Sequence, residues 1–136
     1  MIKNFIVFLS FSLIFSQPTI YFVYNANNDF ISIIGDFVHK SVSPTTYSCN
    51  LCKLSYGIFT KTKKWEAFLN TLEYEFSFIY KNEKTPILNH IDSFPVVLIQ
   101  YDNQIDILVS TDEMNSYKNL DDMIMGLNKR IANLKK

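Results

Sequence analysis

The chain has 136 residues, 48% hydrophobic and 19% charged, which is the composition of a globular protein of ordinary domain size. Its 13 basic and 13 acidic residues balance and are spread along the chain, so nucleic acid is not an expected partner. Only 3 glycines and 4 prolines argue against disorder, and 12 Phe and 8 Tyr can fill a core without covalent cross-links.

The N-terminus has the pattern of a secretory signal peptide. Lys3 precedes an apolar run that ends before Ser16, a small residue at a suitable cleavage point. We therefore expect a signal peptide at residues 1–16 and a single domain at residues 17–136, exported to the periplasm or the exterior. The alternative is an uncleaved anchor at residues 4–23, which would be the chain's one contact with a membrane.

The first third of the domain predicts a strand, a helix and a segment of neither kind. Residues 19–24 are β-branched and aromatic, which is typical of a buried strand. Asn28 or Asp29 can then cap a helix that ends before Ser43. Its apolar residues follow helical spacing: Phe30, Ile33, Ile34, Phe37 and Val38. Residues 45–58 match neither period and contain both cysteines, so they predict a loop or a short irregular helix.

A second helix and a second strand follow the cysteines. Thr60 or Thr62 can cap the helix, whose apolar positions are Trp65, Phe68, Leu69 and Leu72. Residues 74–80 alternate in polarity, with Phe76 and Phe78 on one face. This alternation predicts a strand, which we expect to lie parallel to the first.

The last third predicts a hairpin and a long helix. Residues 81–93 form a polar connection that can include one helical turn after Pro86. Residues 95–101 and 104–110 flank Asp102 and Asn103, a spacing that favours a tight antiparallel hairpin. The final segment has the apolar period of an amphipathic helix, carried by Leu120, Met123, Ile124, Leu127, Ile131 and Leu134.

This order of elements predicts an α/β fold with a four-stranded mixed sheet flanked by helices on both faces. The order resembles the thioredoxin-like fold. In that family a cis proline opens the third core strand beside the redox cysteines, and Phe94-Pro95 stands in that position. The family's C-x-x-C normally follows the first strand directly, whereas in this chain a helix is expected between them.

A second resemblance covers most of the predicted domain. It is carried by Val23-Tyr-Asn-Ala26, His39-Lys40, Ser43-Pro44-Thr45, Tyr47, Cys49-Asn-Leu-Cys52, Tyr56-Gly57 and Trp65 with Phe68. These segments look like a family of uncharacterised bacterial proteins, some of which are labelled GTPases. This chain has no G-x-x-x-x-G-K-[ST] motif, and with 3 glycines it can hardly build a phosphate cradle.

The concentrated chemistry of the chain is the C-x-x-C pair, Cys49 and Cys52. As a catalytic pair these residues would cycle between dithiol and disulfide with a protein or small-thiol partner. Cys49 is the better attacking residue if a helix begins at the motif, because its thiolate would lie at the positive helix end. Tyr47, Tyr56 and Pro95 are candidate substrate-binding neighbours.

Two other uses of the cysteine pair stay open. In an exported protein the pair can form a permanent disulfide that braces a non-enzymatic binding module. Together with His39 and His90, the thiolates of Cys49 and Cys52 could instead supply four zinc ligands, although the histidines lack the paired spacing of zinc modules. The redox and structural uses require no cofactor.

Overall fold

The computed structural model of the chain describes residues 16–28, 49–56 and 61–135. The predicted leader up to residue 15 and the predicted helix after Asp29 lie outside these ranges. No helix within them is long and apolar enough to cross a membrane. Residues 19–23, the last part of the alternative anchor, belong to a strand at the centre of a sheet.

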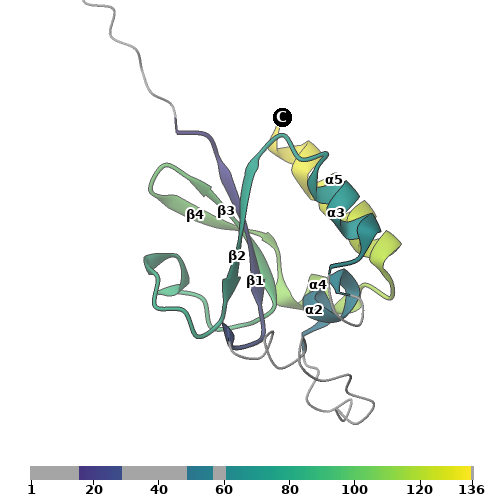
Figure 1. Cartoon of the computed structure of the whole chain (residues 1–136). Coiled ribbons are helices and arrows are strands. Elements are labelled where there is room, and N and C mark those ends of the chain that lie inside the picture. The colour runs from purple at the N-terminus through teal and green to yellow at the C-terminus, as the bar shows by residue number, and fades with distance from the viewer. Residues whose placement is uncertain (1–15, 29–48, 57–60, 136) are drawn as a thin grey trace, which may run out of the picture.

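Four strands form one mixed sheet in the order β2-β1-β3-β4 (Figure 1). Strand β1 (Thr19–Tyr24) pairs in parallel with β2 (Glu75–Tyr80) and antiparallel with β3 (Val96–Tyr101). Strand β4 (Gln104–Val109) runs antiparallel to β3 and therefore in the same direction as β1. The predicted α/β class and the four-stranded mixed sheet are confirmed.

The alternation of side chains along the strands separates two apolar layers. Ile20, Phe22 and Tyr24 of β1 face one layer, and Val23 faces the other. Phe22 stacks on Phe78 of β2 with ring centroids 5.3 Å apart. Since neighbouring residues of a strand point to opposite faces, the β1 pattern requires cover on both sides of the sheet.

Four α-helices cover the first of these faces (Figure 1). They are α2 (Asn50–Ser55), α3 (Lys63–Leu69), α4 (Thr111–Ser116) and α5 (Leu120–Leu134). Each buries apolar residues in the layer that contains Phe22, namely Leu51, Trp65, Phe68, Leu69, Met114, Met123 and Leu127. Thr62 caps α3 as one of the two predicted alternatives, because its Oγ1 accepts from the Trp65 N–H at 3.2 Å.

The prediction also places helices on the opposite face, and this part stays a prediction because the predicted helix after Asp29 lies outside the described residues. Within the described ranges that face is closed by the connection 81–94, whose regular part is one 3₁₀ turn, η2 (Pro86–Leu88). Ile87, Leu88, Ile91 and Phe94 of this connection pack over Val23, Ile79, Val96 and Leu98. These four apolar side chains stand at i, i+1, i+4 and i+7, a spacing that a helix would also give, yet the segment forms only one 3₁₀ turn.

The hairpin between β3 and β4 agrees with its prediction. Tyr101 pairs with Gln104, so Asp102 and Asn103 form a two-residue turn. Asp102 has φ of 51°, in the left-handed region that aspartate tolerates better than most residues. The turn leads into β4, which lies at the edge of the sheet. Helix α4 begins shortly after β4 ends.

Candidate functional site

Cys49 and Cys52 are joined in a disulfide at the start of α2. The sulfurs are 2.09 Å apart and the Cα atoms 5.2 Å apart. Cys49 is the N-cap residue of the helix, and its Sγ accepts a hydrogen bond from the Cys52 backbone N–H at 3.2 Å. The sulfur thus takes the place of the Ser, Thr, Asp or Asn oxygen that usually caps a helix. Of the two predicted alternatives, a loop or a short helix, the described part of this segment forms a short helix, and it begins at the motif.

Both cysteines lie inside the apolar layer under the helices. Cys49 is 3% exposed and Cys52 is 2% exposed, and both belong to the cluster that contains Tyr24 and Trp65. Burial in apolar surroundings raises the pKa of a thiol, whereas the N–H donor and the helix start stabilise a thiolate. In the disulfide neither cysteine titrates, so these two opposing effects would act on Cys49 only after reduction.

Asn50, the first residue between the cysteines, ties the motif to α4. Its Nδ2 donates to the carbonyl oxygen of Met114 at 2.8 Å and to that of Tyr117 at 3.0 Å. These carbonyls belong to the last turn of α4 and to its C-cap residue, where a helix lacks internal donors. The side chain therefore satisfies orphan acceptors of another helix and holds the disulfide segment against it.

The sheet brings the start of α2 and Pro95 to the same end of the molecule. Val96, the first residue of β3, pairs with Val23 near the carboxyl end of β1. Strand β4 runs in the direction of β1, so α4 and the α2 segment bonded to it also lie at that end. The Phe94–Pro95 bond is cis and Pro95 is buried. The topology therefore places Pro95 and the disulfide at the same end of the strands.

Tyr56, the C-cap residue of α2, belongs to an aromatic group that packs in the same apolar layer as the disulfide. Its ring lies 6.0 Å from that of Tyr24, at an interplanar angle of 64°. Lys61 pairs with Tyr56 through a β-bridge and places its Nζ 3.5 Å from the centroid of the Phe78 ring. Burial lowers the pKa of Lys61, and the nearby Glu66 carboxylate opposes that shift. The cation is thus held on aromatic faces.

Two buried polar atoms in this layer, the hydroxyl of Tyr24 and the indole nitrogen of Trp65, have no partner in good hydrogen-bond geometry among the described residues, although the side chains of Tyr56 and Ser55 lie close enough to the Tyr24 hydroxyl to affect its pKa. Burial, and next the electrostatic effect of Tyr56, raise the pKa of Tyr24 far above its usual range. Tyr24 therefore stays protonated at any ordinary pH. Sequence patterns marked Tyr24 and Trp65 as core residues but gave no sign that their polar atoms would be left unpaired.

Of the remaining predicted site residues, the structure describes only His90, and His90 does not lie at the disulfide. His39 and Tyr47 lie outside the described ranges. His90 is exposed on the connection 81–94, in a hollow of about 250 Å³ that Ile107 and Asp112 also line. That connection packs on the face of the sheet opposite the cysteines. Among the described residues, no three His, Cys, Asp or Glu side chains come together as a metal site would require.

No family model, curated protein or solved structure matches the chain. The resemblance to a family of uncharacterised bacterial proteins therefore stays a prediction. The resemblance to the thioredoxin-like fold stays a prediction too; what the structure shows is the strand order β2-β1-β3-β4, the parallel pair of β1 and β2, and Pro95 directly before β3. Asn50 is the contributor to the site that sequence reasoning missed, because nothing in a C-x-x-C pattern indicates a bond to a segment 64 residues away.

Proposed function

We propose that the chain is an exported thiol–disulfide redox protein whose reactive couple is Cys49 and Cys52. The observation that carries the proposal is the position of the disulfide: Cys49 caps α2, and the Cys52 N–H already donates to the Cys49 sulfur. After reduction the same N–H would stabilise a thiolate on Cys49. A backbone donor at a helix start is one of the recurring ways in which proteins make a cysteine reactive.

The proposed reaction consists of two exchanges. The Cys49 thiolate attacks a disulfide in the partner, forming a mixed disulfide and releasing one partner thiolate. The Cys52 thiolate then attacks the Cys49 sulfur, which restores the intramolecular disulfide and releases the second partner thiolate. Two electrons pass from the protein to the partner, and the reverse sequence oxidises a dithiol partner. No cofactor takes part.

Candidate contacts for the partner are Tyr56, Pro95 and Tyr47. Tyr56 ends the helix that the disulfide begins, and Pro95 lies at the same end of the strands. Tyr47 lies two positions before Cys49 in the sequence. We propose that these residues contact a protein or small-thiol partner.

The disulfide closes a very short loop, which also favours a role in thiol–disulfide exchange over a purely structural role. The cysteines are separated by 3 positions in the sequence. By the loop-closure relation, so short a cross-link stabilises the folded chain by about 2 kcal/mol, compared with nearly 5 kcal/mol for a loop of about 100 residues. A pair selected for stability alone would gain more from joining distant segments.

One observation favours a second candidate, in which the disulfide is permanent and the chain is a non-enzymatic binding module. Both cysteines are almost fully buried, whereas exchange requires that one sulfur be reached by its partner. In this reading the disulfide fixes α2 against α4 through Asn50. Both candidates agree with export, because disulfides persist in oxidising compartments and the N-terminus has a signal-peptide pattern.

The reduction potential of the couple separates these candidates. The folded protein is equilibrated with mixtures of reduced and oxidised glutathione, and the fraction of free thiol is measured after acid quenching and alkylation. A redox couple is expected between about −270 and −120 mV, the range of thioredoxin-like oxidoreductases. A value below about −300 mV is that of a structural disulfide and would reject the redox proposal.

A further inference from the structure

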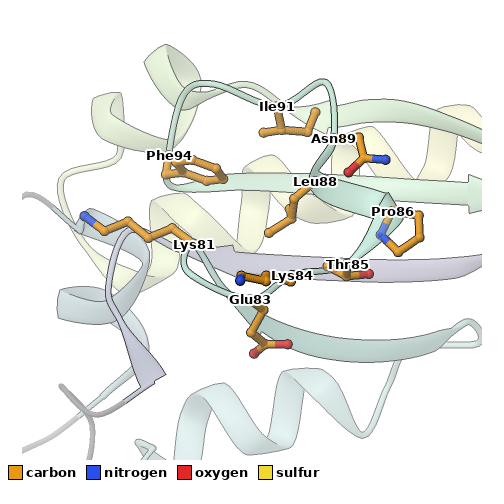
Figure 2. A pocket seen from close by; sticks show the side chains of 9 residues that line it. All are labelled: Lys81, Glu83, Lys84, Thr85, Pro86, Leu88, Asn89, Ile91 and Phe94. Atoms are coloured by element: carbon orange, nitrogen blue, oxygen red, sulfur yellow. The ribbon is translucent and has the colours of Figure 1, made fainter.

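The connection 81–94 encloses a hollow on the face of the sheet away from the cysteines (Figure 2). Its volume is about 480 Å³, within the range of roughly 300–1,000 Å³ that is usual for small-molecule sites. Nine residues line it, and all belong to this connection: Lys81, Glu83, Lys84, Thr85, Pro86, Leu88, Asn89, Ile91 and Phe94. The redox proposal makes no use of this hollow.

Its apolar wall is anchored to the sheet. Leu88, Ile91 and Phe94 pack against the buried layer formed by Val23, Ile79, Val96 and Leu98, and each stays partly exposed. Backbone hydrogen bonds from Leu88 to Thr85 and from Ile91 to Leu88 hold the turns between them. The wall is therefore formed before any ligand arrives, which reduces the ordering cost of binding.

The polar side of the hollow carries two lysines without a carboxylate partner. Figure 2 shows Lys81 and Lys84 below Leu88, Ile91 and Phe94, with the Lys81 ammonium directed away from Lys84. Lys81 donates to the neutral Asn25 side chain, and none of the ion pairs among the described residues involves Lys81 or Lys84. Within residues 16–28, 49–56 and 61–135, neither of these two positive charges is compensated by an ion pair.

The one acid in the lining does not neutralise these lysines. Glu83 Oε1 accepts the Tyr80 backbone N–H at 3.0 Å, and Figure 2 shows its carboxylate directed away from the apolar wall. Two ammonium groups and one carboxylate give the lining a formal charge of +1. Charge and shape together favour a ligand with a negative end and an apolar body.

We propose that this hollow binds a small organic anion with an apolar chain, such as a medium-length alkyl carboxylate. The carboxylate faces Lys81 and Lys84, and the chain lies on Leu88, Ile91 and Phe94. The site is independent of the cysteine pair, so it stands whether or not the redox proposal holds.

The test is a titration of the ¹⁵N-labelled full chain, disulfide intact, with sodium octanoate, followed by amide chemical shifts. Saturable shifts are expected at residues 81–94. Octanol, which has the same chain without the charge, is expected to bind about fivefold more weakly, since a surface ion contact contributes up to about 1 kcal/mol. Acetate, which has the charge without the chain, is expected to produce no saturable shift.

A matched pair of charge reversals locates the site. Lys84→Glu is expected to weaken octanoate binding about fivefold, whereas Lys118→Glu, at an exposed lysine elsewhere, leaves it unchanged. Both side chains are exposed, so neither change should affect folding. Equal affinities for octanoate and octanol, equal effects of the two variants, or shifts that do not saturate would each overturn the proposal.

Discussion

Asn50 connects the chemistry of the cysteine pair to the rest of the fold. One amide group satisfies two carbonyl oxygens at the end of α4, at 2.8 and 3.0 Å. A hydrogen bond of this kind adds little to the free energy of unfolding when it is made. Removing the donor from a buried acceptor lowers that free energy by about 1–3 kcal/mol. The hydrogen-bonded contact between the disulfide segment and α4 therefore depends on the side chain of Asn50, which stands between the two cysteines in the sequence.

Asn50→Ala is expected to lower the free energy of unfolding by about 1–3 kcal/mol, because it leaves the Met114 and Tyr117 carbonyls without this donor. Urea denaturation of the oxidised protein, followed by circular dichroism, measures the change. Asn115→Ala is the matched control, since Asn115 is exposed on α4, and its effect should stay within about 0.5 kcal/mol. Equal effects of the two substitutions would show that Asn50 does not hold the segment.

At the scale of elements, the corner between α4 and α5 depends on a close contact of Tyr117 with Gly126. A Cβ atom at residue 126 would overlap the ring and hydroxyl of Tyr117. The Tyr117 hydroxyl donates to Glu113 Oε1 at 2.9 Å, and Arg130 donates two hydrogen bonds to the same carboxylate. The hydrogen bond from Arg130 keeps the pKa of Glu113 below its usual value, so the corner is held by an ionised acid at neutral pH.

Gly126→Ala is expected to lower the free energy of unfolding by about 1–2 kcal/mol, even though alanine is about 1 kcal/mol better than glycine inside a helix. The reason is that the new methyl group would displace the Tyr117 ring from its contact with Glu113. Chemical denaturation measures the change.

In a Tyr117→Ala background the same substitution meets no ring and is expected to become stabilising by up to about 1 kcal/mol. If Gly126→Ala stabilises the otherwise unchanged protein, the close contact is not real.

Several elements could be predicted because their signals are local. The apolar period from Leu120 to Leu134 predicted the full length of α5. The alternation in polarity around Phe76 and Phe78 predicted β2, with these two side chains on one face of the strand. The way in which the connection 81–94 covers the face of the sheet away from the cysteines could not be predicted. It depends on Leu88, Ile91 and other scattered apolar residues in a polar segment, and their common contact with Val23 is visible only after the sheet has formed.

At the scale of the whole molecule, strand order brings the cysteine segment and Pro95 to one end of the sheet. The sequence predicted the class, the parallel pair of β1 and β2, and the hairpin, because each follows from short spacings or from the handedness of crossovers. It predicted that the sulfurs of Cys49 and Cys52 could meet, since C-x-x-C allows it. It could not predict their burial, which depends on the packing of four helices against β1.

The same arrangement sets the limits of the proposed chemistry. The helix start favours a Cys49 thiolate and burial opposes it, so the balance of these two effects decides whether the pair exchanges or only braces. Within α2, Cys52 lies inside the helix, where its sulfur has no comparable cap position. The two cysteines should therefore differ in reactivity if the redox account is correct.

The most direct test compares Cys52→Ser with Cys49→Ser, each folded and each carrying one free thiol, in reaction with oxidised glutathione at pH 7. Formation of the mixed disulfide is followed by mass spectrometry, with circular dichroism to confirm that both variants are folded. The account predicts that the Cys49 thiol of the Cys52→Ser variant reacts about tenfold faster or more, because thiolate fraction and access govern the exchange rate. Equal rates, a faster Cys52 thiol, or two unreactive thiols in folded protein would contradict it.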